Sequence, residues 1–397
     1  MSFGIQNSVV ESSHGQLFLK AGQGIIATLA LQQRFLRFKK RQLAADVRSI
    51  LVIHQLFLGD AIMLTPLLAR LRGQYPDATI TVAMPWSQVP IYSGLPFGVI
   101  AVPFDAKGRG SVDNLLRVAA KQNGFDLAIL PGENRYAWHA AACDARWIIG
   151  FSGGDTYKTW PLDVQQAWPE APMSLPDIFS SLAPNNAARQ LNSLAAWPAP
   201  VGGLGAHATT TLANSTPYAV LHVGASNPKK FWAAANWAKL AQKITESGTQ
   251  VVWSAGKNET HLLENCGVQP VHINLAGELD LGQMWHLLNN AAFLVAPDTG
   301  IAHLARLTQT PAINLFGAGP TKLYAETALL AHQSQFMPLV LSELPERYQT
   351  SLFKRPLNWL QNYAAFGGLM AANAEKGAGF DAVWDKVLSL QTRKQNA

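Results

Sequence analysis

The chain has 397 residues, of which 48% are hydrophobic and only 14% are charged. This composition excludes a globally disordered protein, and the length predicts two compact domains. The formal charge of +6 suits a partner that carries phosphate groups, while Cys143 and Cys266 have no CxxC spacing and indicate neither a zinc site nor a disulfide framework.

The first 48 residues form an extension that ends in a basic segment. Residues 34–41 read Arg-Phe-Leu-Arg-Phe-Lys-Lys-Arg and interleave bulky apolar groups with five positive charges. This pattern is typical of a helix that lies on an anionic membrane surface. A solvated basic helix that packs on the neighbouring domain is the alternative. No apolar run in the chain is long enough to predict a transmembrane helix.

The next part of the chain predicts a parallel sheet with helices between its strands. Residues 49–54 form a nearly continuous apolar run, as in a buried strand, and a turn at 58–60, a helix over 61–75 and a strand over 78–83 follow. Such a unit requires a crossover onto a parallel sheet. Further strands are predicted at 99–102, 127–130 and 147–149, with helices at 112–122 and 136–144 between them. The pattern indicates a doubly wound α/β domain.

A second α/β domain follows a linker. Residues 196–217 are rich in Pro, Gly and Thr, and beyond them the alternation restarts. Strands are predicted at 218–223, 250–254, 271–274, 292–296 and 311–315, and helices at 236–246, 259–266, 282–290, 300–307 and 321–330. Residues 331–379 give no clear pattern, and 380–391 predict a terminal helix. The expected segments are an extension (1–48), a first domain (49–200), a linker (201–216), a second domain (217–379), and a C-terminal helix and tail (380–397).

The segment from Leu294 to Ala305 carries the clearest chemical signal. Its apolar strand ends at Pro297, and a helix begins almost at once. Asp298 or Thr299 can cap that helix, Gly300 leaves room for a ligand, and His303 falls on the first turn. The free amides of such a helix start suit a phosphate group. An ordinary Asp cap beside a buried histidine is the alternative.

Two further loops of the second domain suit a nucleotide. After the strand at 218–223, Gly224 and Ser226 offer donors, and Lys229 or Lys230 offers a charge that can neutralise a diphosphate. After the strand at 250–254, Ser254 begins a loop in which Glu259 could accept hydrogen bonds from a ribose or base. The alternatives are a turn with solvated lysines and a surface glutamate.

The loop after the first strand points to catalysis. Residues 56–60 read Leu-Phe-Leu-Gly-Asp and lack the G-x-G-x-x-G spacing of a dinucleotide site. Since an acid here would repel a diphosphate, Asp60 is predicted to take a proton from an attacking hydroxyl. Its alternative role is to cap the helix from Ala61. Gly59, Asn134 and Arg135 are assigned to the same acceptor side, and no cluster of metal ligands is present.

Three segments together resemble glycosyltransferase family 9, the bacterial ADP-heptose:lipopolysaccharide heptosyltransferases. They are residues 50–68, residues 224–232 with Gly-Ala-Ser and Lys-Phe-Trp, and residues 298–303 (Asp-Thr-Gly-Ile-Ala-His) followed by Phe316 and Gly317. The resemblance covers about residues 49–320. It implies a GT-B fold, in which two Rossmann-like domains face an interdomain cleft, the first binding the acceptor and the second the nucleotide-sugar donor.

The resemblance also implies roles for single residues. Asp60 would be the general base of an inverting transfer, Lys230 would bind the donor diphosphate, and Thr299 and Gly300 would contact the phosphates. Asp298 and His303 would complete the pocket, and Glu259 would lie near the nucleoside. No metal cofactor would be needed. The donor would be a nucleotide-diphosphate sugar such as ADP-heptose, and the acceptor a lipopolysaccharide core or related glycan at the cytoplasmic face of the inner membrane.

The chain departs from the family in its first 48 residues, in residues 318–378, and at His54 and Gln55, where an arginine is common. Two other functions stay open on the same fold, a catalytically idle sugar-nucleotide-binding protein and a nucleotide-sugar 2-epimerase. The lack of a glycine-rich fingerprint disfavours a nicotinamide dehydrogenase, and no nucleic-acid partner is expected.

Overall fold

A computed structural model describes most of the chain, namely residues 13–36, 42–106, 108–184, 197–213, 217–308, 310–316, 321–324, 336–340, 349–352, 355–361 and 379–395. Its first half contains α1 (Ser13–Leu36), β1 (Ser49–Ile53), α2 (Leu58–Met63), α3 (Thr65–Gln74), β2 (Thr79–Met84), β3 (Val99–Pro103), α4 (Arg109–Lys121), β4 (Phe125–Leu130), α5 (Ala137–Ala142), β5 (Ala145–Phe151), α6 (Thr156–Thr159), β6 (Val164–Gln166) and α7 (Leu175–Ser180). Short 3₁₀ helices lie at η2 (Trp86–Tyr92), η3 (Pro96–Gly98) and η4 (Asn134–Tyr136).

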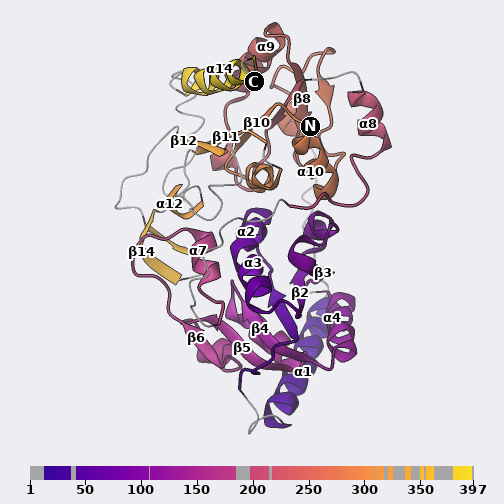
Figure 1. Cartoon of the computed structure of the whole chain (residues 1–397), viewed down its shortest axis with the longest axis vertical. Coiled ribbons are helices and arrows are strands. Elements are labelled where there is room, and N and C mark those ends of the chain that lie inside the picture. The colour runs from indigo at the N-terminus through magenta and orange to yellow at the C-terminus, as the bar shows by residue number, and fades with distance from the viewer. Residues whose placement is uncertain are drawn as a thin grey trace, which may run out of the picture. The chain divides into compact units, whose positions relative to one another are not determined.

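The second half repeats the alternation (Figure 1). It contains α8 (Ala206–Leu212), β7 (Tyr218–His222), η5 (Pro228–Lys230), α9 (Ala234–Glu246), β8 (Gln250–Ser254), η6 (Thr260–Leu263), β9 (Ile273–Asn274), α10 (Leu281–Asn289), β10 (Phe293–Pro297), α11 (Gly300–Leu304), η7 (Ala305–Leu307), β11 (Ala312–Phe316), α12 (Thr321–Tyr324), β12 (Phe336–Val340), β13 (Gln349–Leu352), β14 (Arg355–Gln361) and α14 (Phe380–Gln395). The predicted α/β class is confirmed.

Both six-stranded sheets have the same topology. The first runs β3-β2-β1-β4-β5-β6 and the second β12-β11-β10-β7-β8-β9. Parallel registers place Leu51 opposite Ala128 in the first sheet and Leu294 opposite Val220 in the second. In each sheet the strand order reverses between two central strands, β1 and β4 or β7 and β10. Ligands of open α/β sheets bind at the carboxyl ends of the strands at such a reversal.

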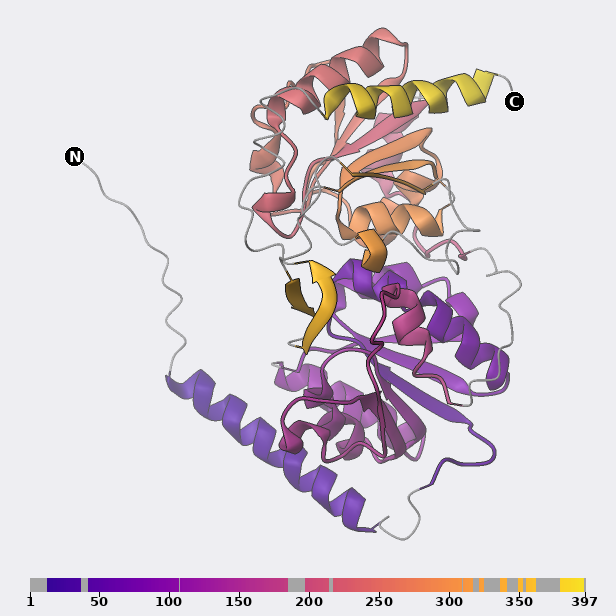
Figure 2. The same ribbon diagram turned by 90° about the vertical axis from the view of Figure 1, so that its left-hand side faces the viewer.

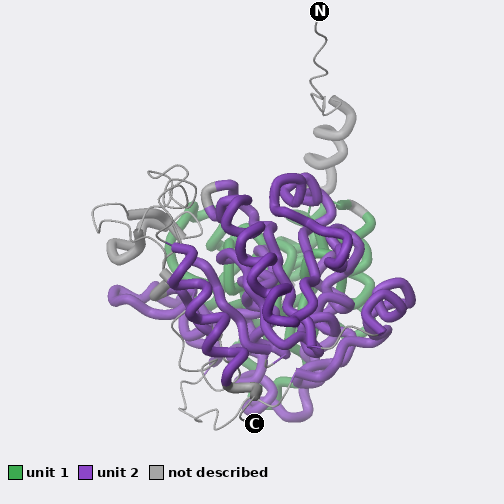
Figure 3. The backbone as a smooth tube through the Cα atoms, turned by 90° about the horizontal axis from the view of Figure 1, so that it is seen from above, with its two compact units in different colours: residues 1–55, 81–86, 102–165 green, residues 56–80, 87–101, 166–397 purple. Residues whose placement is uncertain are grey.

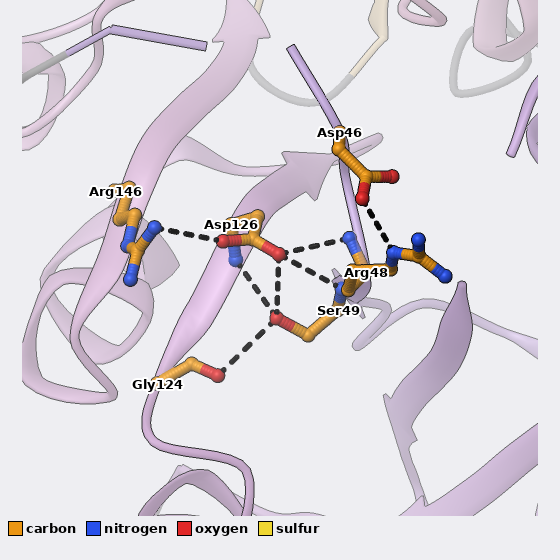
Figure 4. Close-up of polar contacts among 6 residues, drawn as sticks. All are labelled: Asp46, Arg48, Ser49, Gly124, Asp126 and Arg146. Atoms are coloured by element: carbon orange, nitrogen blue, oxygen red, sulfur yellow. Dashed lines mark hydrogen bonds and ion pairs between the residues drawn. The ribbon is translucent and has the colours of Figure 1, made fainter. Parts of the chain in front are cut away.

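A buried carboxylate fixes the amino ends of the first sheet's strands (Figure 4). Asp126 of β4 accepts the backbone N–H groups of Arg48 and Ser49 at 2.9 and 3.1 Å, and the hydroxyl of Ser49 at 3.2 Å. Its other oxygen lies 3.3 Å from the guanidinium of Arg146 on β5. The network therefore ties β1, β4 and β5 together at the edge opposite the loops that carry the predicted chemistry.

The two terminal helices pack on opposite halves of the chain. Helix α1 packs on α5 through Ile26 and Ala30, which are buried in the core of the first sheet. Helix α14 packs beside α9 (Figure 2). The Lys239 ammonium of α9 lies 4.0 Å from the centre of the Phe380 ring of α14. Phe380 also stacks on Trp232, so the terminal helix helps to hold the loop that contains Lys230.

The chain divides into two compact units (Figure 3). The first comprises residues 1–55, 81–86 and 102–165, and the second comprises residues 56–80, 87–101 and 166–397. Residues 56–60, which follow β1, thus belong to the unit that contains the second sheet. Their contacts with that sheet's loops lie within one unit.

Several predicted elements differ from those observed. The helix predicted at 61–75 is divided into α2, which begins at Leu58, and α3, because Pro66 has no N–H to continue a helix. The helix predicted at 259–266 is the 3₁₀ turn η6, and the one at 300–307 ends as the 3₁₀ turn η7. Residues 325–330 of the helix predicted at 321–330 lie outside the described residues.

Sequence analysis missed most of α1, the 24-residue helix Ser13–Leu36, of which it indicated only the last residues. The other missed elements are short, namely α6, β6, α7 and α8, and the strands β12, β13 and β14 in the stretch that gave no pattern. Strand β6 has only three residues, Val-Gln-Gln, which is too short for a hydrophobic period to emerge. Of the basic segment 34–41, residues 34–36 end α1, and 37–41 lie outside the described residues. Arg34 is buried and pairs with Asp163 at 3.0 Å, so its charge is not part of a basic surface.

Candidate functional site

The loop between β10 and α11 forms one wall of the candidate site. Helix α11 begins at Gly300 after Thr299, whose side chain makes no capping hydrogen bond. Asp298 is not the cap either. Its buried carboxylate accepts the Lys230 ammonium at 2.6 Å, and the same ammonium donates to the backbone carbonyl of Asp298 at 3.1 Å. The two loops that suit a phosphate are thereby joined by an ion pair.

His303 lies on the other side of that carboxylate. Its Nε2 is 3.7 Å from Asp298 Oδ1, and the side chain is almost completely buried. Burial lowers the pKa of His303, and the contact with Asp298 offsets only part of this effect. Burial alone would raise the pKa of Asp298, but Lys230 and His303 hold that pKa well below its usual range. Asp298 is therefore a permanent anion whose charge Lys230 balances.

The pKa of Asp60 is shifted in the opposite direction to that of Asp298. Asp60 is the third residue of α2, where its carboxylate accepts the backbone N–H of Phe57 at 3.2 Å, and it is 8% exposed. The predicted alternative role as the residue that caps a helix from Ala61 is wrong, because the helix begins three residues earlier. Burial raises the pKa of Asp60 to about 7, although the bond from Phe57 and the charge of Lys230 both lower it.

Two glycines allow α2 to lie against α11. A Cβ on Gly300 would come within 2.7 Å of Leu58 Cβ, and a Cβ on Gly59 would come within 3.1 Å of His303 Cδ2. Real Cβ atoms do not approach as closely as 2.7 Å, so this packing requires glycine at position 300, whereas a side chain at position 59 would require the His303 ring to shift. The space predicted at Gly300 for a ligand is therefore partly filled by Leu58.

A pocket of about 230 Å³ opens beside these contacts. Its lining includes the predicted donor-side residues Ser226, Ser254, Glu259, Thr299 and Gly300. Its other lining residues are Phe57, Leu58, His222, Ala255, Gly256, Leu275, Leu279, Leu281, Met284 and Ile301. The pocket therefore lies at the carboxyl ends of β7, β8 and β10, where the second sheet reverses its strand order.

The carboxylate of Glu259 lies between two glycine-containing loops. Its Oε2 accepts the backbone N–H of Gly256 at 3.0 Å, and a Cβ on Gly224 would come within 2.0 Å of that oxygen. A larger residue at position 224 would therefore displace the Glu259 carboxylate from this place. The carboxylate is half-buried at the pocket wall. Glu259 directly precedes the 3₁₀ helix η6, so the alternative interpretation is right that it lies at a helix start and wrong that it is a surface residue.

Ser254 is buried at the pocket wall beside His222. Its hydroxyl lies 3.0 Å from His222 Nδ1 and 3.6 Å from Met284 Sδ. Burial lowers the pKa of His222 to about 4, so this imidazole is neutral near pH 7. With Leu275, Leu279 and Leu281, Met284 gives the pocket an apolar wall, which suits the flat face of a nucleobase.

Sequence analysis missed this wall and two residues near the acidic groups. Leu275 and Leu279 lie in the loop between β9 and α10, Leu281 is the first residue of α10, and no spacing in the sequence marks them as pocket residues. The Tyr324 ring lies 6.4 Å from that of His303, and burial, together with Asp60 and Asp298, raises its pKa well above the usual value. Burial lowers the pKa of Arg306 to about 9, and Asp298 offsets part of this effect.

Asn134 and Arg135 belong to the first compact unit. The buried amide of Asn134 donates to the Phe151 carbonyl at 2.7 Å and to the Gly153 carbonyl at 3.3 Å, and so holds the loop after β5. Arg135 is half-exposed, pairs with Glu133 at 2.9 Å and lies over the Tyr136 ring. Asn134 is therefore occupied by backbone contacts, whereas Arg135 is accessible.

The described residues hold neither a metal site nor a membrane-spanning helix. No group of three or more His, Cys, Asp or Glu side chains within the described part of the chain is arranged to hold a metal ion. None of the described helices is long and apolar enough to cross a membrane.

Comparison with known proteins gives a consistent family. The sequence profile of glycosyltransferase family 9 (heptosyltransferase) matches residues 116–355, more than half of the chain. Lipopolysaccharide heptosyltransferase 3 of Escherichia coli K12 is 23% identical over 66% of this chain and 80% of its own length. Lipopolysaccharide heptosyltransferase 2 of Salmonella typhimurium is 26% identical over 73% of this chain and 88% of its own length.

Solved structures agree on the fold. The glycosyl transferase family 9 protein of Veillonella parvula superposes with a TM-score of 0.64 at 18% identity, over 85% of this chain and 99% of that one. ADP-heptose lps heptosyltransferase II of E. coli superposes with a TM-score of 0.60 at 21% identity, over 84% and 99%. The two parallel sheets are those of the GT-B fold. By the match of its sequence to the family profile, the chain belongs to glycosyltransferase family 9 and is a glycosyltransferase.

Proposed function

We propose that the protein transfers a heptose from ADP-heptose, or a closely related nucleotide-diphosphate sugar, to a lipopolysaccharide core or related glycan. One observation carries the proposal. The pKa values of two carboxylates, Asp60 and Asp298, are shifted in opposite directions, and the positive charge of Lys230 acts on both. Environments that push the pKa values of neighbouring carboxylates apart are typical of sites that divide acid–base and electrostatic roles.

Asp60 is the general base in this proposal. With a pKa of about 7, it is largely ionised at slightly alkaline pH and is still basic enough to accept a proton. As the acceptor hydroxyl attacks the anomeric carbon, Asp60 takes the hydroxyl proton, the new glycosidic bond forms and the bond to the nucleoside diphosphate breaks. A single displacement of this kind inverts the anomeric centre.

Lys230 stabilises the leaving diphosphate. In the ligand-free chain its ammonium is paired with Asp298, and a bound diphosphate would share that charge together with the amides of Thr299 and Gly300. Asp298 and His303 keep the lysine in place. The nucleoside would occupy the pocket, with Glu259 near the ribose and the apolar wall against the base. Gly224, Ser226 and Ser254 complete the donor side.

Gly59 and Arg135 are proposed to act on the acceptor side, each within its own compact unit. Gly59 sets the position of Asp60, and Arg135 is an accessible cation at the carboxyl end of β4. Such a cation suits the anionic groups of a lipopolysaccharide core. Asn134 connects the segment after β4 to the loop after β5 through its hydrogen bonds to the Phe151 and Gly153 carbonyls.

The test separates transfer from binding. Asp60→Ala should abolish sugar transfer while the variant still binds ADP, measured by calorimetry. Asp113→Asn, which removes an exposed carboxylate on α4, is the control and should leave both properties unchanged. Undiminished turnover in Asp60→Ala would remove Asp60 from the mechanism. If the unaltered protein binds ADP-heptose but transfers nothing to a lipopolysaccharide core acceptor, the alternative of a sugar-nucleotide-binding protein is favoured.

A further inference from the structure

Phe57 is a large apolar residue that the folded chain leaves uncovered. It is 74% exposed, although it lines the pocket beside α11. It directly precedes Leu58, the first residue of α2, and Asp60 lies three residues further along the chain. Large apolar groups exposed at the wall of a pocket mark a contact surface. Phe57 is therefore placed where a ligand in the pocket can cover it.

No structural role accounts for a phenylalanine at this position. Phe57 caps the start of α2, where Ser, Thr, Asp and Asn are preferred because their side chains accept a backbone N–H, and it makes no such bond. Within the described part of the chain, no other aromatic ring stacks on it. The side chain neither caps the helix nor joins the core, and such departures from local preference concentrate at functional sites.

The backbone around Phe57 is held on both sides. The Leu56 carbonyl accepts the side-chain amide of Gln88, a buried residue, at 2.9 Å. The Phe57 N–H donates to Asp60 at 3.2 Å, and the Phe57 carbonyl accepts the N–H of Ala61 at 3.0 Å. The ring is thus kept near the Asp60 carboxylate, free only to rotate about its own side-chain bonds. A ring held in this way loses little conformational freedom when a ligand covers it.

The pocket places Phe57 with the residues proposed to hold the diphosphate. Leu58, Thr299 and Gly300 line the same pocket, and Leu58 lies against Gly300. In the proposed transfer, the anomeric carbon of the donor lies between the diphosphate and the hydroxyl that Asp60 deprotonates. The sugar ring is attached at that carbon. It is therefore the part of the donor nearest to Asp60, and hence to Phe57.

A phenyl ring distinguishes between the parts of a nucleotide sugar. The edge of a sugar ring carries hydroxyl groups, whereas its faces carry hydrogens bound to carbon. The negative face of an aromatic ring attracts these slightly positive hydrogens, and the contact also removes apolar area from water. A diphosphate is strongly hydrated and gains nothing from an apolar neighbour. The chemistry of Phe57 therefore suits the sugar of the donor and not its phosphates.

We infer that Phe57 packs on the sugar ring of the nucleotide-diphosphate donor and selects donors whose sugar presents an apolar face to it. The inference rests on the proposed function, which supplies the position of the anomeric carbon. Phe57 determines specificity for the sugar, while deprotonation remains with Asp60 and charge neutralisation with Lys230. Sequence analysis assigned Phe57 no role.

Calorimetry with ADP and with ADP-heptose tests the inference. Phe57→Ala should bind ADP-heptose about 3- to 10-fold more weakly than the unaltered protein and bind ADP equally well, because only ADP-heptose carries the sugar. Phe57→Tyr, which keeps the ring, should restore most of the affinity for ADP-heptose. Phe35→Ala is the matched control. Phe35 is 82% exposed on α1 and does not line the pocket, so both affinities should stay unchanged.

Three results would overturn the inference while the proposed function stands. Phe57→Ala could bind ADP-heptose as tightly as the unaltered protein does. It could lose equal affinity for ADP and ADP-heptose, in which case the ring contacts the nucleoside or the diphosphate. It could keep both affinities and show only a higher KM for the acceptor, in which case the ring contacts the acceptor sugar. If the unaltered protein does not bind ADP-heptose at all, the proposed function fails and the inference falls with it. An unchanged unfolding temperature shows that each variant is folded.

Discussion

The ionisation of Asp60 gives the sharpest test of the site. Its pKa is raised from an ordinary value of 3.8 to about 7, mainly by burial. A shift of about three units corresponds to about 4 kcal/mol between the two protonation states, at 1.36 kcal/mol per unit. Since the folded chain holds this proton more tightly than the unfolded chain, Asp60 destabilises the fold once the pH rises above about 4. The full cost is reached above about pH 7.

Asp60→Asn removes the ionisation and retains most of the shape. The variant should therefore be more stable than the unaltered protein at pH 8, by up to about 4 kcal/mol, and this difference should shrink towards zero near pH 4. Urea unfolding at several pH values measures it. The exposed Asp113→Asn change should produce no such trend. A stability difference that does not grow from pH 5 to pH 8 would contradict the argument from burial.

The same ionisation should determine how the rate of transfer depends on pH. For the unaltered protein, kcat/KM for the donor should rise about tenfold per pH unit below pH 7 and level off above it, because only ionised Asp60 acts as a base. Asp60→Asn should lower kcat by about 10²- to 10⁴-fold at every pH. A gain in stability combined with this loss of rate would show that the chain retains a destabilising acid for catalysis. A rate that is flat from pH 5 to pH 8 would refute the role of Asp60.

Three other predictions concern the neighbouring contacts. Lys230→Met should weaken ADP binding by about 10- to 100-fold in calorimetry and lower turnover as well, because it removes a charged partner of the diphosphate; equal affinity would argue against its role. Gly300→Ala should cost about 1–3 kcal/mol in urea unfolding, since the new methyl meets Leu58 Cβ at 2.7 Å, and adding Leu58→Gly, which removes that Cβ, should restore part of that loss. Arg34→Met should destabilise by about 3–5 kcal/mol because it leaves Asp163 buried without its cation, and less if Asp163→Leu is combined with it.

The sequence determined the class of fold and the positions of most strands. Runs such as residues 49–54 and 250–254 are apolar on both faces, which only a covered parallel strand tolerates, and β1 and β8 occupy those positions. The loop after each central strand was also recognisable, because glycine and acidic or basic residues break the apolar pattern there. The segments 50–68, 224–232 and 298–303 together were sufficient to indicate the family, which the family profile confirms.

Only the tertiary structure decided how these loops act on one another. Lys230 and Asp298 are 68 residues apart, and no local pattern reveals that they form an ion pair instead of a free lysine and a helix cap. The pKa of Asp60 depends on its burial, which results from packing α2 against α11 through two glycines. The apolar wall of the pocket and the inward position of Arg34 have the same origin. Each depends on which distant side chain fills the adjacent space, and this is a property of the folded chain that no single segment contains.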